Sequence, residues 1–312
     1  MKRAFVFPGQ GSQTPGMGQA LAAAFPAARQ LFAEVDEALS QHLSRLMFEG
    51  PESELMLTEN AQPALLAASL AVIRVLESEA GFDIARQAAY VAGHSLGEYS
   101  ALAAAGALSV TEAARLVKRR GQAMQKAVPV GVGAMAALLG LDVEAARAVA
   151  EAAAQSQVCD LANDNSPGQI VVSGHRSAVE RAVALAAKRG ARTIMLPVSA
   201  PFHCSLMSPA AETMTVALAE TALEAPLVPL VANAAAAATS DPEQIKELLV
   251  EQTTRMVRWR ETVLLFAANQ VEEVVEIGAG RVLAGLVKRI DRTLSARSVG
   301  TPADVDALVP LF

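Results

Sequence analysis

The sequence has few cysteines and few aromatic residues. Only two cysteines, Cys159 and Cys204, occur among its 312 residues, so we expect no disulfide framework and a reducing cytoplasm as its location. Phenylalanine, tyrosine and tryptophan together make up 4% of the chain, which is too little for an aromatic platform that stacks nucleic-acid bases. A formal net charge of -6 also argues against a general binder of polyanions.

Long uninterrupted hydrophobic runs are missing as well. The apolar stretch Ala4–Phe7 breaks at Pro8-Gly9, which makes it too short for a signal peptide, so secretion is not indicated. Longer uncharged stretches, such as residues 193–211, are interrupted by prolines and by His203, so we expect no membrane span. With 52% hydrophobic residues, the chain can bury a large core. We therefore expect a soluble globular protein.

Short apolar runs separated by helical patterns indicate an α/β fold. Each run suits a strand that is buried on both faces, as in a parallel sheet. The length allows one large domain, or a large and a small one. The predicted strands cover Ala4–Phe7, Ala89–Ala92, Leu227–Ala232 and Val271–Ile277.

Residues 130–198 follow a different order, β-α-β-β-α-β, which is that of a ferredoxin-like unit. We therefore predict a small subdomain at residues 130–198, inserted into a large α/β domain that is formed by residues 1–129 and 199–312. The short polyalanine patch at residues 234–238 gives no clear prediction. In order, the subdomain's predicted elements are the strand Gly133–Leu141, the helix Val143–Ala154, the strands Gln157–Ala162 and Gln169–Ser173, the helix Ala178–Arg189 and the strand Arg192–Val198.

The stretch Gly93-His94-Ser95-Leu96-Gly97 lies between a predicted strand and a helical pattern over residues 98–108. A serine between two glycines in a strand–turn–helix is the setting of a nucleophile elbow. The turn strains the backbone of the serine, so both flanking positions need glycine. The hydroxyl then lies at a helix N-terminus, where partial positive charge favours a developing anion. Ser95 is thus a candidate nucleophile, with an ordinary surface turn as the alternative.

A serine hydroxyl needs a base that takes its proton, and histidine is the usual one. His203 stands where the predicted subdomain ends and the chain returns to the large domain, so it can face the elbow. His42 and His175 have charged neighbours and are expected to face solvent. His94 adjoins the nucleophile in a tight turn, where the side chain usually points elsewhere. A structural histidine is the alternative for His203.

A second glycine-rich turn, Phe7–Gln13, follows the first predicted strand. Ligand sites lie at the carboxyl ends of parallel strands, so this turn should open at the same sheet edge as Ser95. The backbone N–H groups of Gln10 and Leu96 are then a candidate pair of donors to an acyl oxyanion. The turn is no phosphate-binding loop, because no Gly-Lys-Ser/Thr follows it. A simple helix-starting turn is the alternative.

A basic run comprising Arg115, Lys118, Arg119 and Arg120 lies on the next predicted helix. Most of such a run is normally a solvated face. Arg120, however, precedes Gly121, which permits a close approach, and the arginine fork binds a carboxylate through two hydrogen bonds. We take Arg120 as a candidate for recognising an acidic acyl group, with an exposed arginine as the alternative.

Together these motifs resemble the malonyl-CoA:acyl carrier protein transacylase family, the acyltransferases of fatty acid biosynthesis. The resemblance extends from the first strand to Gly278, nearly the whole chain. The sequence departs from the family pattern at Asp164, where an aromatic residue is often found, and at Ala279, where proline is frequent. The motifs that carry the resemblance are Phe7–Gln13, Gly93–Glu98, Arg120-Gly121, Asn165–Gln169, Phe202-His203 and Gln252.

The resemblance implies a large α/β-hydrolase-like catalytic domain with the inserted subdomain, and a ping-pong malonyl transfer. By it, Ser95 is the acyl-accepting nucleophile and His203 the general base, a Ser-His dyad oriented by a main-chain carbonyl instead of an aspartate. Arg120 would clamp the free malonyl carboxylate, and Gln10 and Leu96 would form the oxyanion hole. The other substrate-binding residues it implies are Gln252, His94, Asn165 and Phe202, the last of which leaves little room for an α-methyl group.

The resemblance also sets expectations for partners. The substrates would be malonyl-CoA and the phosphopantetheinylated acyl carrier protein, with no metal or redox cofactor, no nucleic acid and no membrane. We expect a cytoplasmic monomer. An acidic carrier protein needs a basic landing surface. The candidates are one cluster of Lys288, Arg289 and Arg292, and a second cluster of Lys188, Arg189 and Arg192.

Alternative functions remain at this point. A serine hydrolase or thioesterase shares the nucleophile elbow, but it usually has an Asp or Glu between the serine and the histidine in the chain. A malonyl-transfer subunit of a malonate decarboxylase would differ only in its acceptor. A scaffolding protein would require Ser95, His203 and Arg120 to coincide by accident.

Overall fold

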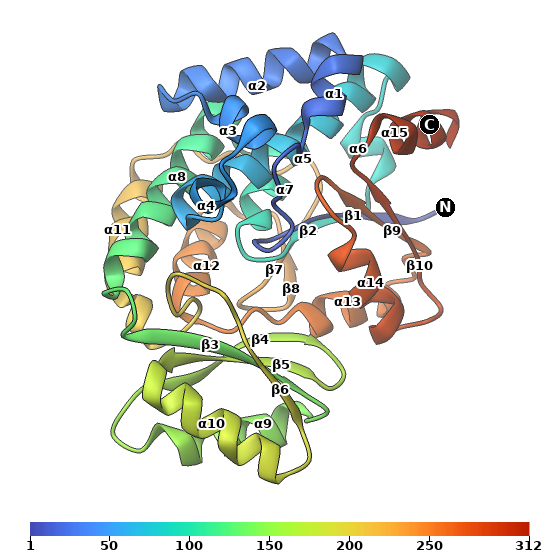
Figure 1. The fold of residues 1–312 in the computed structure, drawn as a ribbon. Coiled ribbons are helices and arrows are strands. Elements are labelled where there is room, and N and C mark those ends of the chain that lie inside the picture. Colours follow the sequence, from blue (N-terminus) through green and yellow to red (C-terminus); the bar gives the residue numbers. More distant parts are fainter. Residues whose placement is uncertain (312) are drawn as a thin grey trace.

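The larger of two sheets forms the centre of the molecule (Figure 1), and the computed structural model describes residues 1–311. Its strand order is β10-β9-β1-β2-β7-β8, and only β8 runs antiparallel to its neighbour. This confirms the predicted α/β class with a parallel core. The strands are β1 (Arg3–Phe7), β2 (Tyr90–Gly93), β7 (Leu230–Ala232), β8 (Ala237–Thr239), β9 (Glu273–Ile277) and β10 (Ser295–Val299).

The central strand β1 explains why the sequence shows apolar runs here instead of alternation. Ala4 and Val6 pack into one cluster with Val274, while Phe5 and Phe7 pack into another on the opposite face. All the residues of β1 are buried. A strand that is covered on both faces has no solvent side, so Ala4–Phe7 form a continuous apolar run.

One predicted strand of this sheet is shorter than expected, and two strands were not predicted. The strand expected at Leu227–Ala232 is only Leu230–Ala232, because Pro229 has no N–H to donate and Leu227 is 63% exposed. The edge strand β8 occupies part of the polyalanine patch, whose exposed alanines carry no strand pattern. The other edge strand, β10, was not predicted, since its partly exposed serine and arginine side chains give no apolar run.

Helices cover both faces of the large sheet (Figure 1). The helix predicted over residues 98–108 is α7 and ends at Ala104, shortly before Gly106, whose φ of 74° is left-handed. These helices are α1 (Gln19–Ala24), α2 (Pro26–Leu39), α3 (Leu43–Glu49), α4 (Glu52–Leu55), α5 (Thr58–Ala80), α6 (Ile84–Gln87), α7 (Gly97–Ala104), α8 (Val110–Ala127), α11 (Ser208–Ala219), α12 (Pro242–Thr254), α13 (Trp259–Ala268), α14 (Val282–Ile290) and α15 (Pro302–Leu308).

Helix α5 is long and apolar enough to cross a membrane by length and composition alone. In the fold, however, 83% of its most apolar window is buried inside the protein. It packs against α2, α7 and α8. Its hydrophobicity is thus that of a core helix.

The smaller sheet has the order β4-β5-β3-β6 and is antiparallel throughout. The order β-α-β-β-α-β along the chain agrees with the sequence analysis, whereas the boundaries at residues 130 and 198 stay a prediction. The predicted second strand, Gln157–Ala162, is displaced, because β4 runs on to Ser166 and stays paired with β5 through two register shifts. The elements are β3 (Gly133–Leu139), α9 (Val143–Ala154), β4 (Cys159–Ser166), β5 (Gln169–His175), α10 (Arg176–Lys188) and β6 (Arg192–Met195).

The alternation along β3 positions this smaller sheet. Ala134, Ala136 and Leu138 pack under α9 and α10, whereas Met135 and Ala137 face a second cluster that includes Met124 of α8 and Phe202. Successive side chains of a strand point to opposite faces. The inserted sheet therefore rests on the large domain beside the chain segment that carries His203.

Candidate active site

Ser95 sits in the sharp turn between β2 and α7, with a left-handed φ of 53°. The flanking glycines are required by space: a Cβ on Gly93 would lie 1.8 Å from the carbonyl carbon of Gly97, and one on Gly97 would lie 2.2 Å from the oxygen of Phe7. A non-glycine residue at such φ is strained, and strain of this kind is held in place by its surroundings. The geometry is that of the predicted elbow.

The Oγ atom of Ser95 lies 2.7 Å from Nε2 of His203. His203 also has a left-handed φ, of 58°, and its Nδ1 lies 2.8 Å from the main-chain oxygen of Gln252. That carbonyl belongs to the last turn of α12, where carbonyls lack intrahelical partners. With Nδ1 protonated toward this oxygen, Nε2 is free to accept the serine proton.

Burial, with a smaller contribution from the charge of Arg120, lowers the pKa of His203 to about 3. The imidazole is therefore neutral at physiological pH. A neutral imidazole is the form that can act as a base.

Arg120 is the one member of the basic run that turns inward. It is 1% exposed, whereas Arg115 on the same helix is exposed. The Nη2 atom of Arg120 donates to the Oγ of Ser95 at 3.1 Å and to Oε1 of Gln252 at 2.7 Å. Its Nη1 donates to Oε1 of Gln62 at 2.8 Å. A buried guanidinium that has no carboxylate in contact among residues 1–311 is unusual, and it can bind an anion that arrives beside Ser95.

The loop after β1 lies against the elbow, as predicted. A Cβ on Gly9 would be 2.7 Å from the carbonyl oxygen of His94, so the two turns touch. Within residues 1–311, the N–H groups of Gln10 and Leu96 donate to no protein acceptor. The side chain of Gln10 accepts from the hydroxyl of Thr58 at 2.9 Å. Two free N–H groups next to a nucleophile are what an oxyanion needs.

The side chain of His94 contacts the small sheet. Its Nε2 lies 2.9 Å from Oδ1 of Asn165, on strand β4 of the small sheet. The structure therefore brings these two predicted residues together with each other. Phe202, next to His203, is 8% exposed and packs with Met124 and Met207.

The remaining predicted histidines and basic clusters lie on the surface. His42 is exposed, and His175 is half-buried with its Nδ1 accepting from the N–H of Val158 at 3.0 Å. Arg289, at the end of α14, donates to the side chain of Gln169 on β5 at 3.1 Å. The basic residues of both candidate docking clusters are exposed: Lys188, Arg189, Arg192, Lys288, Arg289 and Arg292.

Two polar residues that hydrogen-bond directly to Ser95 or Arg120 were missed by the sequence analysis. Asn233, fully buried, accepts the N–H of Ser95 at 2.8 Å and donates to the carbonyl of Gly93 at 2.7 Å. Gln62, on α5, holds Arg120. A signal for Asn233 was present, because it directly follows the parallel strand β7 at the sheet edge that also bears Ser95. Gln62 lies in a largely apolar helix and carries no such signal.

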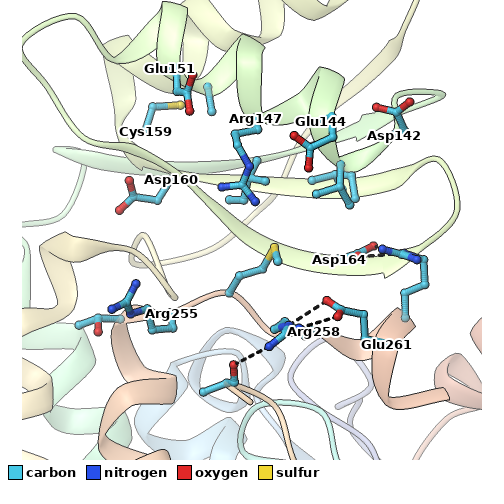
Figure 2. A pocket seen from close by; sticks show the side chains of 18 of the residues that line it. Asp142, Glu144, Arg147, Glu151, Cys159, Asp160, Asp164, Arg255, Arg258 and Glu261 are labelled. Atoms are coloured by element: carbon cyan, nitrogen blue, oxygen red, sulfur yellow. Dashed lines mark hydrogen bonds and ion pairs between the residues drawn. The ribbon is translucent and has the colours of Figure 1, made fainter. Parts of the chain in front are cut away.

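A separate cavity of about 1280 Å³ lies between α9, β4 and residues 254–261. Figure 2 shows Glu144 and Arg147 on one side of it and Arg258 and Glu261 on the other. Ser95, His203 and Arg120 do not line this cavity. Among residues 1–311, no group of three or more histidine, cysteine, aspartate and glutamate side chains could hold a metal ion.

Comparison with known proteins agrees with this geometry. The model of a family described as "Acyl transferase domain" matches residues 4–310. The chain is 47% identical to the malonyl CoA-acyl carrier protein transacylase of Escherichia coli (strain K12), over 99% of both chains. It is 46% identical to the protein of that name from Bacillus subtilis (strain 168), over 99% of this chain and 96% of that one.

Solved structures give the same result. An acyl-carrier-protein S-malonyltransferase from Bartonella henselae superposes with a TM-score of 0.97 at 53% identity, covering 100% of this chain and 99% of that one. A malonyl-transacylase in complex with a type II polyketide synthase acyl-carrier protein superposes with a TM-score of 0.96 at 44% identity, covering 100% of both chains. The chain belongs to the acyl transferase family, among the malonyl CoA-acyl carrier protein transacylases, and the resemblance inferred from its motifs is confirmed.

Proposed function

We propose that Ser95 carries the malonyl group between its two thiol partners in a ping-pong reaction. The chain transfers a malonyl group from coenzyme A to an acyl carrier protein in fatty acid biosynthesis, in line with relatives that match along its whole length. The observation that carries the mechanism is the contact of the Ser95 hydroxyl with both His203, at 2.7 Å, and Arg120, at 3.1 Å. This contact brings a nucleophile, a base and a cation together in one buried site.

In the first half-reaction, Nε2 of His203 takes the proton from Oγ of Ser95 as Oγ attacks the thioester carbonyl of malonyl-CoA. The free N–H groups of Gln10 and Leu96 receive the developing oxyanion. The carbon–sulfur bond then breaks, and His203 returns its proton to the sulfur of coenzyme A. A malonyl ester on Ser95 remains.

In the second half-reaction, the phosphopantetheine thiol of the carrier protein gives its proton to His203 and its sulfur attacks the ester. The bond to Oγ breaks, and Oγ recovers the proton. Every step exchanges one thioester or ester for another, so the residues need no metal or redox cofactor. The carbonyl of Gln252 keeps the imidazole oriented throughout, since its contact with Nδ1 is made on the side away from the serine.

Arg120 supplies the recognition of the substrate's free carboxylate. Its guanidinium is buried and donates to two glutamine side chains, and no carboxylate in the described part of the chain forms an ion pair with it. A malonyl carboxylate that reaches it forms a charge-assisted pair in a dry environment, where such pairs are strong. The proposed acyl-binding site also includes Phe202, Asn165 and His94.

The carrier protein docks on a basic part of the surface, at one of the two exposed clusters. The solved complex of a similar malonyl-transacylase with an acyl-carrier protein supports a carrier partner for this chain. Both cysteines are free and buried, which suits the reducing cytoplasm in which we place the enzyme, as a monomer. The boundaries of the inserted subdomain at residues 130 and 198 belong to the same proposal.

A transfer assay tests this function. Purified chain, malonyl-CoA and phosphopantetheinylated carrier protein are mixed, and the carrier is followed by mass spectrometry. We expect malonyl carrier protein to form with the wild type and not with Ser95→Ala, with a loss on the order of 10⁶-fold. Steady release of malonate without transfer would instead indicate a hydrolase.

A further inference from the structure

Glu98 is a buried carboxylate that the proposed chemistry does not use. It stands in the first turn of α7, three residues after Ser95 in the chain, and is 1% exposed. Among the described residues it takes part in no ion pair within 4.0 Å. Burying a carboxylate is costly unless its oxygens accept hydrogen bonds. The hydrogen-bond donors to Glu98 therefore indicate its role.

Both carboxylate oxygens of Glu98 accept from the active site. Oε1 accepts the backbone N–H of Asn233 at 2.6 Å, and Oε2 accepts from Nε2 of Gln252. Asn233 in turn holds the N–H of Ser95, and Gln252 contacts Arg120. Glu98 thus hydrogen-bonds directly to Asn233, which accepts from the nucleophile's N–H group, and to Gln252, which accepts from the cation Arg120.

The side-chain amide of Gln252 can take only one orientation here. Its Oε1 faces Nη2 of Arg120 at 2.7 Å, and a guanidinium can only donate. Its Nε2 donates to the carbonyl of Ser95 at 2.9 Å and to Glu98. Glu98 supplies the second acceptor that holds the amide nitrogen on that side. Without Glu98, one of the two N–H groups of the Gln252 side-chain amide would have no acceptor in the buried site.

We propose that Glu98 is a positioning residue that sets the preference for acyl groups ending in a carboxylate, because it fixes the amide of Gln252 with its oxygen toward Arg120. This inference rests on the proposed malonyl transfer. With the amide fixed, the guanidinium of Arg120 is directed at Ser95. With the amide free to rotate, its NH₂ can face Arg120, and the cation loses the acceptor that directs it.

The substitution Glu98→Gln keeps the size of the side chain and removes one acceptor. An amide offers one oxygen and one NH₂ group, so it cannot accept from both Asn233 and Gln252. Glu98→Asp keeps two acceptor oxygens on a shorter stem.

The test compares two substrates in the first half-reaction. Loading of the enzyme by malonyl-CoA and by acetyl-CoA is followed by rapid quenching and intact-protein mass, giving kcat/KM for each. For Glu98→Gln we expect malonyl loading to fall by roughly 10- to 100-fold, the range for lost support of a site residue, and acetyl loading to fall much less. Equal losses for both substrates, or no loss, would overturn the inference.

Glu276→Gln is the matched control. Glu276 is also fully buried, and its two oxygens also accept N–H groups, in this case the backbone N–H groups of Leu283 and Ala284. It lies near the end of β9, two strands from β2, which leads into Ser95. We expect this variant to lose thermal stability as Glu98→Gln does, but to keep the ratio of malonyl to acetyl loading. A changed ratio in Glu276→Gln would mean that general destabilisation, and not Glu98, sets the preference.

Gln252→Met gives a second route if Glu98→Gln folds poorly. It removes the amide while keeping the main-chain carbonyl that contacts His203. We expect the same shift in the substrate ratio, because this substitution removes the amide through which Glu98 acts. An unchanged ratio would contradict the inference. Absence of any malonyl adduct on the wild type would refute the proposed function itself, which is a different result.

Discussion

At the scale of single residues, three side chains define the chemistry. Ser95 and His203 both have left-handed backbone conformations, which concentrate at functional sites. Arg120 lies against them as a buried cation whose pKa is lowered by burial. Its charge is the feature that distinguishes this site from a general esterase, which binds apolar acyl groups.

Replacing Arg120 with alanine should harm malonyl transfer selectively. A carboxylate buried without its partner is destabilised by roughly 2–5 kcal/mol, whereas acetyl-CoA has no such group. Steady-state rates with the two substrates measure the difference. Equal losses for both would remove the proposed role of Arg120.

The lowered pKa of His203 predicts an unusual pH profile. In the unfolded chain histidine titrates near about 6.5, but in the fold it stays neutral down to about 3, so the base remains competent in mild acid. Malonyl loading should show no loss centred near about pH 6.5. Stability, by contrast, is lost as pH falls from the unfolded toward the folded pKa, because only the unfolded chain binds this proton. Loading rates, taken where circular dichroism shows folded protein, check this; an acid limb near the free-histidine pKa would contradict it.

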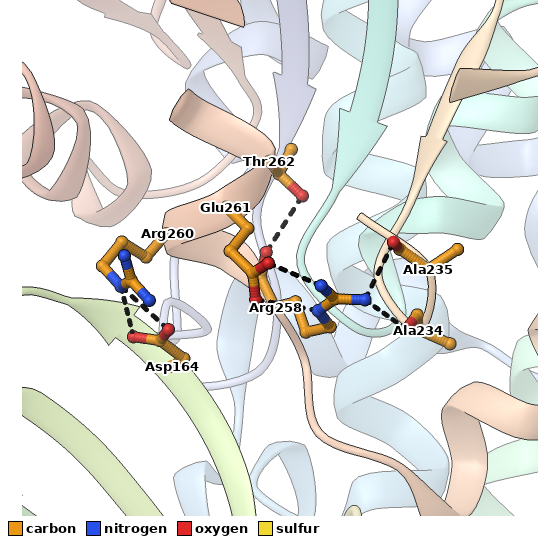
Figure 3. A network of polar contacts seen from close by, with 7 residues as sticks. All are labelled: Asp164, Ala234, Ala235, Arg258, Arg260, Glu261 and Thr262. Atoms are coloured by element: carbon orange, nitrogen blue, oxygen red, sulfur yellow. Dashed lines mark hydrogen bonds and ion pairs between the residues drawn. The ribbon is translucent and has the colours of Figure 1, made fainter. Parts of the chain in front are cut away.

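At the scale of elements, the contact between β4 and α13 joins the small sheet to the large domain. The N–H of Asp164 donates to the carbonyl of Val257 at 2.9 Å, extending the edge of β4. Figure 3 shows Arg260 aimed at Asp164, whose two oxygens accept from Nε at 3.1 and 2.9 Å. This pair gives a structural reason for the departure of the sequence from the family pattern at position 164.

Asp164→Asn should therefore destabilise the fold. Asp164 is 1% exposed in its side chain and Arg260 29%, so we expect a loss of about 1–3 kcal/mol, below that of a fully buried pair. Urea unfolding measures it. The exposed pair of Arg45 and Glu49 is the control, and Glu49→Gln should change the stability little. Similar effects of the two substitutions would show that Asp164 is not a tie between the domains.

The elements that the sequence predicted best have strong local signals. Helix α9 has the predicted bounds Val143–Ala154, because Asp142 caps its start by accepting the N–H of Ala145 at 2.8 Å. The elbow was recognised from its glycines, at which the fold leaves no room for a Cβ atom. Edge strands such as β8 and β10 were missed, since their pairing depends on a neighbour far away in the sequence.

The candidate site shows the same limit. Ser95, His203 and Arg120 were found because their residue types carry chemistry. Asn233 and Glu98 were not assigned a role, although Asn233 directly follows a predicted parallel strand, because an asparagine or a glutamate in such a place gains its role from long-range contacts. The sequence thus predicts the reacting groups better than the residues that orient them.

At the scale of the whole molecule, charge is uneven. The chain carries a net charge of -6, yet Lys288 and Arg292 stand exposed near the end of α14. Arg289 between them donates to the side chain of Gln169 on β5 at 3.1 Å, so this cluster lies where α14 meets the small sheet. A local basic surface can steer an acidic partner in spite of a negative total.

Charge reversal at Lys288 and Arg292 should raise the KM for the carrier protein by roughly tenfold and leave malonyl loading from coenzyme A unchanged. The second cluster, reversed at Lys188 and Arg192, is tested in parallel. We expect one pair to respond and the other to serve as its control. Unchanged KM values in both variants would remove both surfaces from the account.

The central claim is that Ser95 bears the malonyl group as an ester. The most direct measurement is peptide mass spectrometry of the enzyme quenched in acid after exposure to malonyl-CoA. We predict a malonyl adduct on the peptide that contains Ser95, discharged by added carrier protein and absent from Ser95→Ala. An adduct that persists in Ser95→Ala, or that maps to another residue, would contradict the account.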